Sequence, residues 1–399
     1  MKKNKIFLMD FLYSRVVSFL VLFIICLSTF SLTPLPIFSE IINKITLVVC
    51  LVVFFIYLLN GKYSKFSILL MLFWLLLFLS SYLGEYSSIK IAFMSYYKFM
   101  SIVFYLDYGL NHYCEKVISS LYYVLYLLIV INFYTLIKYP NGWYSSSNYA
   151  NNWFFDYDNL HIFMYFPAIL IMYVRNYIKD KKISIGNATL MLMITYCVYY
   201  CFSANTVVAY TLFLYYLFFK KFFDSYEILN SKTYFIIYLV IFFAFVLFRV
   251  QDLFAWLIVG ILGKSLTFTN RTIIWDKIIS FIKTYPLLGY GREPTDIVTY
   301  KLGKSTYTHA HNTILDVTYK GGILSLVVFI SLLNIVVKKL YEYKDYSISK
   351  LVSFILFCAF IMMNFEARQE KIGLYIILIV SYHIQAIIVA CKKSSEGCL

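Results

Sequence analysis

Residues 271–312 read RTIIWDKIISFIKTYPLLGYGREPTDIVTYKLGKSTYTHAHN. They close an interruption of roughly sixty residues, 249–312, which is too long for a simple turn between two helices. This loop is basic, holds two of the chain's five histidines, and runs straight into an apolar helix. Because nearly everything outside it is apolar, we expect the rest of the chain to hold this loop at one face of a bilayer.

The composition is that of a membrane protein. The chain has 399 residues, of which 62% are hydrophobic and 14% are charged, whereas a soluble protein carries about 25% charged residues. Apolar runs of about twenty residues recur, each long enough to cross a ~30 Å hydrocarbon core. The first run, 16–32, lacks a small-residue cleavage site and is expected to remain as a span. The sequence therefore predicts an all-α, polytopic integral membrane protein.

We expect about twelve transmembrane helices. They lie near residues 11–32, 41–59, 67–83, 89–106, 117–137, 159–174, 184–202, 205–219, 233–249, 313–337, 351–365 and 372–391. Lysines concentrate at the amino terminus, at the carboxyl terminus and in every second loop, so this side is expected to be cytoplasmic. Both termini then lie inside, and two long loops, 138–159 and 249–312, lie on the outer face.

Several classes of function are excluded by simpler features. The eight cysteines are scattered, fall mostly in apolar runs and form no CxxC pair, so they indicate neither zinc nor redox chemistry. The net charge of +15 is typical of a membrane protein whose cytoplasmic loops face anionic lipid. No nucleic-acid partner is expected.

The positions of the arginines say more about function than the net charge does. The chain has six, and four of them map to the outer face: Arg249, Arg271, Arg292 and Arg368. A guanidinium offers a planar fork that binds phosphate oxygens bidentately and does not lose its proton. Such a set suits a lipid-linked phosphate or diphosphate, although contacts with lipid headgroups are the simpler alternative.

The sequence of this loop predicts a helix followed by a turn. Apolar residues at 273, 274, 278, 281 and 282 predict an amphipathic helix over 271–285, capped by Thr269 or Asn270 and ended by Tyr285-Pro286. The following turn, 287–292, contains two glycines whose backbone N–H groups could approach an anion.

Two histidines follow the turn. No carboxylate or third histidine lies near His309 and His311 in sequence, so no metal site is expected. The start of a helix disfavours imidazolium, which leaves His311 neutral and able to accept a proton, although a simple interfacial cap explains it equally. Asp316 and Lys320 stand one turn apart in the next span, where pairing is the simplest reading.

These residues together resemble the family of Wzy-type O-antigen polymerases and O-antigen ligases. The resemblance rests on an ordered series of motifs in the last third of the chain: Arg271-x-x-x-Trp275, Pro286-Leu287-Leu288-Gly289-Tyr290-Gly291, His311-Asn312-x-x-Leu315, Gly321-Gly322-Ile323-Leu324 and Asn364-Phe365-Glu366. The chain departs from the family at Ser203-Ala204-Asn205, where many members carry a Ser-Arg pair, so no arginine role is carried over there.

The resemblance implies a glycosyltransferase of the GT-C kind with no cofactor. It would use undecaprenyl-diphosphate-linked oligosaccharide at the outer face of the bacterial cytoplasmic membrane. His311 would activate an acceptor hydroxyl and Arg271 would hold the diphosphate; from charge and side we add Arg292, Arg249 and Arg368. The supporting residues are expected to be Asn312, Asp316, Glu366 and His309. Three aromatic or acidic residues of the other outer loop are candidates for sugar contacts: Trp143, Trp153 and Asp156.

The expected organisation is then N-terminal spans (1–248), an extracytoplasmic catalytic loop (249–312) and C-terminal spans (313–399). The favoured function is polymerisation of repeat units into O-antigen or capsule, with a repeat-unit flippase and a chain-length regulator as candidate partners. A ligase of the same superfamily is the nearest alternative. A lipid-oligosaccharide flippase fits less well. Such a transporter is expected to have spans broken by Gly or Pro, and this chain has few of either, 14 Gly and 6 Pro.

Overall fold

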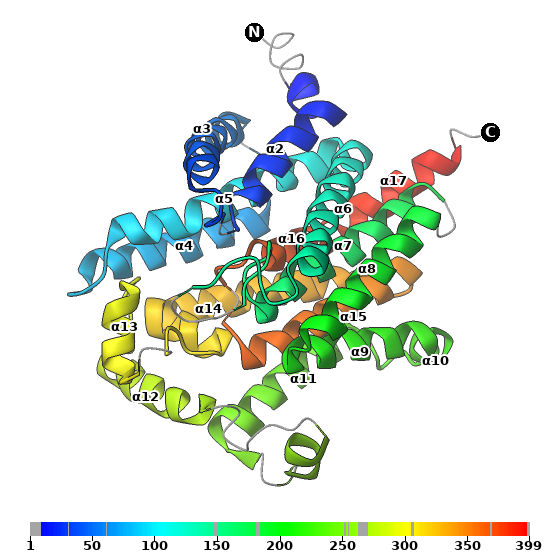
Figure 1. The fold of residues 1–399 in the computed structure, drawn as a ribbon. Coiled ribbons are helices and arrows are strands. Elements are labelled where there is room, and N and C mark those ends of the chain that lie inside the picture. Colours follow the sequence, from blue (N-terminus) through cyan, green and yellow to red (C-terminus); the bar gives the residue numbers. More distant parts are fainter. Residues whose placement is uncertain are drawn as a thin grey trace.

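The computed structural model describes residues 9–30, 32–60, 62–146, 151–180, 184–250, 253, 255–261, 270–304, 307–367 and 369–396. Within them the chain is helical, and two isolated bridges, Tyr144–Asn152 and Trp153–Asp156, are its only extended pairings. The helices are, in order, α2 (Arg15–Leu27), α3 (Pro36–Asn60), α4 (Lys65–Leu83), α5 (Ile89–His112), α6 (Cys114–Lys138), α7 (Asp158–Ile178), α8 (Ile185–Cys201), α9 (Ala204–Phe218), α10 (Lys220–Ser225), α11 (Ser231–Ile241), the π-helices η1 (Phe242–Leu247) and η3 (Trp256–Ile261), α12 (Arg271–Thr284), α13 (Thr295–Leu302), α14 (Thr313–Glu342), α15 (Ser347–Phe365), α16 (Ile372–Tyr382) and α17 (Ile384–Glu396). In Figure 1, α12 and α13 lie on one side of the bundle, and α10 and α17 lie on the other.

The membrane-protein class is confirmed. Six of the described helices are long and apolar enough to cross a bilayer, and a seventh span exists if the pair α16–α17, bent by 60°, counts as one. The six include α5, although Lys90, Lys98 and Asp107 dilute its apolar run. Shorter apolar helices, α2, α8, α9 and the joined α11 and η1, occupy further expected spans. The number twelve remains a prediction.

Polar caps begin several of these helices. The side chains of Ser64, Ser184 and Asn230 accept hydrogen bonds from backbone N–H groups in the first turns of α4, α8 and α11. Each bond satisfies a donor that the helix cannot pair internally. By contrast, Asn270 occupies the expected N-cap position of α12, but its side chain makes no capping bond and its backbone is left-handed (φ 68°). The alternative cap, Thr269, lies outside the described residues.

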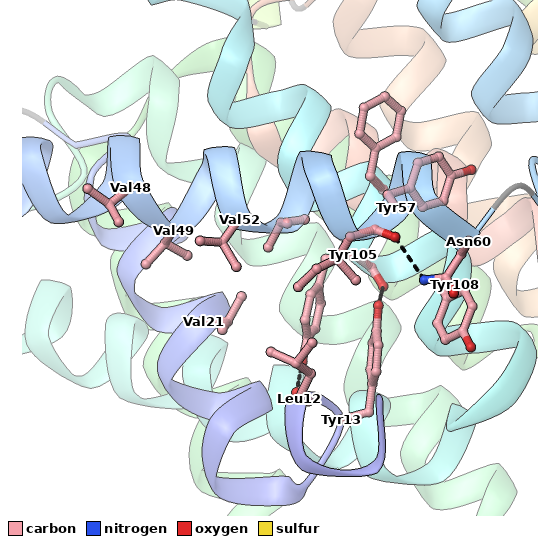
Figure 2. Close-up of a pocket in the computed structure, with 13 residues that line it drawn as sticks. Leu12, Tyr13, Val21, Val48, Val49, Val52, Tyr57, Asn60, Tyr105 and Tyr108 are labelled. Carbon is pink, nitrogen blue, oxygen red and sulfur yellow. Dashed lines mark hydrogen bonds between the residues drawn. The ribbon is translucent and has the colours of Figure 1, made fainter. Parts of the chain in front are cut away.

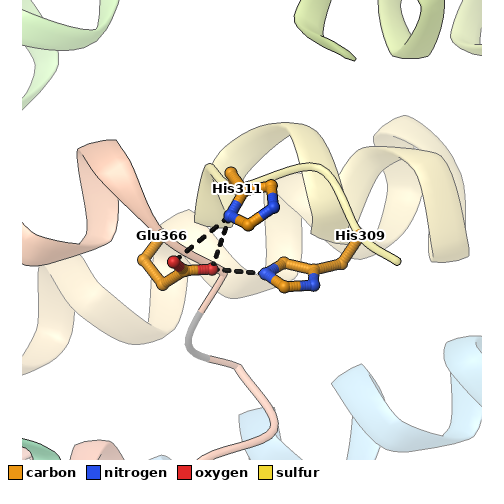
Figure 3. A group of neighbouring side chains, drawn as sticks. All are labelled: His309, His311 and Glu366. Carbon is orange, nitrogen blue, oxygen red and sulfur yellow. Dashed lines mark hydrogen bonds and ion pairs between the residues drawn. The ribbon is translucent and has the colours of Figure 1, made fainter. Parts of the chain in front are cut away.

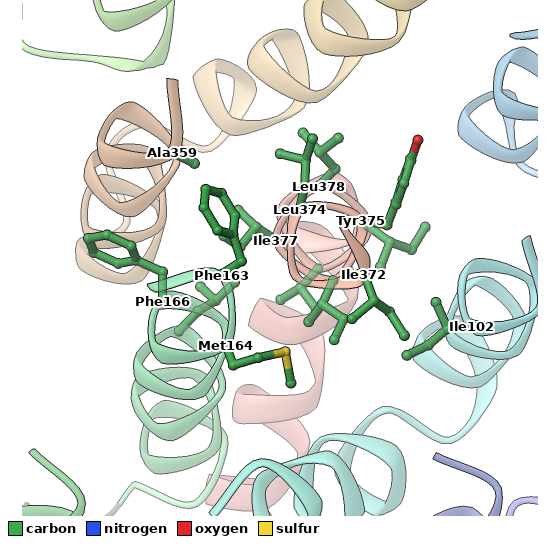
Figure 4. Close-up of a cluster of buried hydrophobic side chains, with 14 of the residues drawn as sticks. Ile102, Phe163, Met164, Phe166, Ala359, Ile372, Leu374, Tyr375, Ile377 and Leu378 are labelled. Carbon is green, nitrogen blue, oxygen red and sulfur yellow. The ribbon is translucent and has the colours of Figure 1, made fainter. Parts of the chain in front are cut away.

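Helix α16 forms the centre of the core. Every residue from Ile372 to Ser381 is buried, and α5, α7, α14 and α15 pack around it. Figure 4 shows Leu374 and Ile377 of this helix beside Phe163 of α7 and Ala359 of α15. A helix that is apolar on all sides is stable only when other helices surround it or when it faces lipid. Here protein surrounds it.

The start of α16 is held against a proline in α7. Pro167 has no N–H, so it cannot donate to the carbonyl of Phe163 one turn earlier. Gly373 lies directly against that carbonyl, where a Cβ atom would collide with it. Residues 369–371, which precede α16, are therefore anchored to the core at their carboxyl end.

Helix α14 is interrupted at Gly322, whose backbone (φ 67°, ψ −173°) is not helical. The segment 286–291 docks into this break through main-chain hydrogen bonds. Tyr290 N donates to Tyr319 O (2.8 Å), Gly291 N donates to Lys320 O (2.8 Å), and Ile323 N donates to Pro286 O (2.8 Å). Gly321 lies against Leu77 of α4, and the break at Gly322 admits this loop.

The docking also changes the expected role of the glycine turn. Its N–H groups at Tyr290 and Gly291 are used by the carbonyls of α14, so they do not form an anion site. The hydroxyl of Ser80 on α4 donates to the carbonyls of Leu288 and Lys320 and fixes the same junction.

A separate apolar pocket lies between α2, α3 and α5. Figure 2 shows Val21, Val48 and Val52 lining it together with Tyr105 and Tyr108. No residue expected to belong to the functional site lines it, so it has no part in that site.

We predict that Gly322→Ala destabilises the protein, because the required backbone conformation is essentially restricted to glycine and a Cβ atom would collide with Leu287 O. The strain alone should cost about 1–3 kcal/mol, seen as a lower melting temperature of the purified protein in detergent. Gly186→Ala in α8 is the control, since its Cβ would meet nothing closer than 3.8 Å. Equal melting temperatures for the two variants would contradict the docking described above.

Candidate functional site

The two histidines are held against the end of α15 by hydrogen bonds. Asn312 caps α14, accepting from Leu315 N (2.9 Å), and donates to Asn364 O (2.9 Å). Thr313 Oγ1 donates to Glu366 O (2.8 Å). Asp316 accepts from Ala310 N (3.2 Å), the residue between the histidines. These bonds join the start of α14 to a segment some fifty residues further along the chain.

Glu366 is the centre of the site. Its side chain is 2% exposed, and Figure 3 shows its carboxylate facing the neighbouring rings of His309 and His311. His311 Nδ1 lies 3.2 Å from Glu366 Oε2, His309 Nε2 contacts Oε1, and Arg271 Nη2 lies 3.4 Å from Oε2. Of the expected residues, His311, Arg271, Glu366 and His309 are thus brought together.

The contacts assign the ring protons. A carboxylate only accepts, so His311 carries its proton on Nδ1 and His309 carries its proton on Nε2. His309 Nδ1 is then free to accept from Thr308 Oγ1 (2.8 Å). His311 Nε2 keeps a lone pair and has no hydrogen-bond partner among the described residues. Of the two rings, His311 is therefore the one with a nitrogen available to take a proton.

His311 is also kept neutral. Burial and the neighbouring His309 lower its pKa to about 4, although Glu366 opposes this change. At neutral pH the ring is uncharged. The cause is chiefly burial, rather than the helix start that the sequence suggested. Its backbone has φ 49°, a conformation uncommon for residues other than glycine. The bonds of Ala310 and Asn312 on either side hold it there.

Arg271 is the first residue of α12, which packs against α14. The helix buries Ile274, Trp275 and Ile278, so the predicted amphipathic helix is confirmed. One guanidinium nitrogen contacts Glu366, and the others have no partner in the described part of the chain. They remain able to bind an anion.

A second charged network lies beside the first. Arg292 Nη2 lies 3.1 Å from Glu370, and Lys320 Nζ lies 2.7 Å from Glu370 and 2.6 Å from Asp316. Gln369 Nε2 also donates to Asp316. Burial raises the pKa of Glu370, but Arg292 and Lys320 outweigh it and hold this pKa well below its usual range. The Asp316–Lys320 pair expected from sequence is present, and Lys320 also bridges to Glu370.

The two networks share a pocket of about 210 Å³. Its lining includes Thr308, His309 and Glu366 from the first network, with Arg292 and Glu370 from the second. His311 and Arg271 are not part of this lining but contact Glu366, which is. The pocket thus combines carboxylates, imidazole and guanidinium groups at the ends of α14 and α15.

Other expected residues lie elsewhere. Arg249 pairs with Asp276 (2.6 Å) and lies over the ring of Trp275, and it does not contact Glu366. Arg368 lies outside the described residues. Trp153 is 6% exposed and donates to Tyr139 O, so it has no free face for a sugar ring.

The group His309, His311 and Glu366 has the composition of a metal site, since its ligand atoms all lie within 4.8 Å of one another. Sequence spacing offered the histidines no third ligand, but the fold supplies Glu366. The Arg271 guanidinium contacts the same carboxylate and opposes a divalent cation there. The donor set therefore fits an arginine-paired carboxylate better than a metal centre.

Sequence reasoning did not find Glu370 or Gln369. Both lie in the short segment between α15 and α16, and Gln369 is 1% exposed. The available signal was a second glutamate four residues after Glu366 between two apolar runs, where charged residues are costly unless paired or functional.

Part of the chain is similar to a known protein family. Residues 162–330 match the model of a family described as O-antigen ligase. This segment of the chain is similar to the O-antigen ligase family. The resemblance inferred from the motifs is thereby confirmed. The matched segment runs from α7 into α14 and contains Arg271, Arg292 and His311. No curated protein matches the chain. Members of the O-antigen ligase family are glycosyltransferase-like enzymes.

We predict that His311→Ala lowers the rate of glycan transfer by about 10²–10⁴-fold, the usual contribution of a positioned base. His309→Ala should be milder, because both its ring nitrogens are already bonded. The measurement uses equal amounts of purified variants in nanodiscs with a lipid-linked repeat unit. A His311→Ala rate within a few-fold of the parent would contradict the assignment, as would a larger loss in His309→Ala.

Arg271→Lys should lose roughly tenfold or more in the same assay, because lysine keeps the charge but not the fork that binds two oxygens. Lys283→Arg on the exposed side of α12 is the control, and it should remain at the parental rate. Near-parental activity of Arg271→Lys at matched protein level would mean that this arginine only anchors α12.

Proposed function

We propose that this protein is a polysaccharide polymerase, which joins undecaprenyl-diphosphate-linked oligosaccharide repeat units into O-antigen or capsule. The observation that carries the proposal is the neutral His311, with Nε2 unoccupied and Nδ1 held by Glu366, beside the Arg271 guanidinium. A base and an anion-binding group at one site are what transfer from a diphosphate leaving group requires.

The chemistry assigns a role to each group. A hydroxyl of the acceptor sugar attacks the anomeric carbon of the donor, and its proton passes to His311 Nε2. The bond between that carbon and the diphosphate oxygen breaks, and undecaprenyl diphosphate leaves with the electron pair. Arg271 stabilises the negative charge that develops on the leaving group. Glu366 positions His311 by accepting from Nδ1, in the way that a carboxylate orients a catalytic imidazole.

Arg292 lines the pocket that Glu366 also lines, and it is the second candidate for diphosphate contact. Its guanidinium is partly used by Glu370, and its side chain is 20% exposed. We assign Arg249 a structural role at α12, because its charge is met by Asp276. Asn312 and Asp316 support the site by fixing the backbone around the histidines.

Similarity to the O-antigen ligase family keeps a ligase as the second candidate. A ligase would transfer a finished glycan to a different acceptor through the same groups. We place the site on the outer face of the bacterial cytoplasmic membrane with both termini inside, on the strength of the lysine distribution. A repeat-unit flippase that delivers the substrate and a chain-length regulator are the proposed partners.

A strain that lacks this gene should still make one lipid-linked repeat unit but no polymer. The measurement is a gel of cell-surface glycans together with analysis of extracted lipid-linked saccharides, with a plasmid-borne copy as the control. A normal ladder of chain lengths in the deletion strain would exclude polymerase function. Polymer that forms but stays on the prenyl lipid would identify the ligase.

A further inference from the structure

A second pocket of about 220 Å³ adjoins the first. It lies among the end of α2, the first half of α5, the start of α7 and the segment before α16. The two pockets share Leu160, Glu370 and Lys371 in their linings. They are therefore neighbours across the 370–371 segment, and a ligand in one lies close to a ligand in the other.

The second pocket holds a lysine without an acidic partner. Lys98 lies on α5, within an apolar span, and its ammonium donates to Ser28 O and to Asn43 Oδ1 (3.1 Å). None of the described carboxylates pairs with it. The cations of the first pocket differ, since Arg292 and Lys320 each face a carboxylate. An ionised group in a membrane span is costly and usually functional, and an ammonium without a counter-charge calls for an anion.

The remaining lining fits a phosphate on a lipid. The hydroxyls of Ser28 and Thr29 line the pocket but already donate to Ile25 O and Cys26 O, whereas Ser95 accepts from Arg292 Nε and keeps its own proton to donate. Apolar walls come from Phe30 and Met94. Met94 is 50% exposed on the outside of the bundle, which leaves an apolar rim for a hydrocarbon chain.

Two carboxylates also line the pocket, and both have partners. Glu370 is neutralised by Arg292 and Lys320. Asp156 accepts from Tyr144 (2.7 Å). Asp156 was expected to contact sugars, and its place in this lining puts it where the saccharide beyond the phosphate would lie.

We propose that this second pocket binds the phosphate headgroup of a second lipid-linked saccharide, with Lys98 as its cationic contact. The proposal rests on the proposed polymerase function, in which both substrates are lipid-linked. The donor loses its diphosphate during transfer, whereas the acceptor keeps its own. The enzyme therefore needs one site beside the base for the diphosphate of the donor, and a second site for the diphosphate of the acceptor, which is not cleaved. The Lys98 pocket supplies the site for the acceptor.

The test is the stoichiometry of undecaprenyl diphosphate bound to the purified full-length chain, measured by native mass spectrometry. The parent should bind two molecules and Lys98→Met one, with the weaker Kd raised roughly 10- to 100-fold by loss of a charged hydrogen bond. Lys98→Arg keeps the charge and should bind two. Lys90→Met, at an exposed lysine of the same helix, is the control and should bind two. One molecule on the parent, or two on Lys98→Met, overturns the proposal.

Competing ligands distinguish the sources of the anion. Phosphatidylglycerol and inorganic pyrophosphate are added to the parent that carries two molecules. Retention of both supports a site for a prenyl diphosphate. Displacement of the Lys98-dependent molecule by phosphatidylglycerol at equal concentration identifies an ordinary headgroup site and overturns the proposal.

The outcome is separable from the polymerase assignment. A parent that binds two molecules but makes no polymer keeps the second site and rejects the function. A parent that polymerises but binds one keeps the function and rejects the site.

Discussion

The architecture of the site depends on one main-chain interaction, the docking of segment 286–291 into the break of α14 at Gly322. Through it, Arg292 emerges next to Lys320 and Glu370, while α12 is carried against α14 with Arg271 at its start. Because backbone atoms make these bonds, their geometry depends on glycine at the break rather than on the side chains of the loop. The loop is thus an integral part of the bundle.

Three cations at or beside the first pocket are paired with carboxylates. Arg271 faces Glu366, and Arg292 and Lys320 face Glu370. This arrangement lowers the cost of keeping several charges at the edge of an apolar bundle, where unpaired ions are expensive. Under the proposed function, a diphosphate must compete with these carboxylates for the same cations. Specificity follows, since a weakly charged ligand cannot offset the loss of those pairs.

Periodicity and composition predicted much of the fold, because apolar runs of span length and the amphipathic stretch 271–285 are local signals. The motifs predicted the family, and they placed His311, Arg271 and Glu366 in one site. The motifs could not predict contacts between residues that are far apart in the sequence. The contact of Glu366 with both histidines depends on how α15 ends beside the start of α14. The separation of these residues in the sequence gives no sign of this contact. The glycine turn was misread for the same reason, since its N–H groups are taken by a helix thirty residues away. Arg249 shares the charge of the other arginines, but its neighbour Asp276 decides its role.

The wall between the two pockets, residues 370 and 371, has a thermodynamic consequence. It is joined directly to the buried α16, and ligands on either side interact through the charge of Glu370. An anion in the first pocket that draws Arg292 away from Glu370 leaves the charge of that carboxylate less compensated, and the carboxylate then repels an anion in the second pocket more strongly. Two anions held at once therefore oppose each other, and linkage requires the antagonism to be mutual and equal. Under the proposed function, an acceptor bound in the second pocket would weaken the binding of the released undecaprenyl diphosphate in the first pocket. Binding of the next acceptor would therefore speed product release.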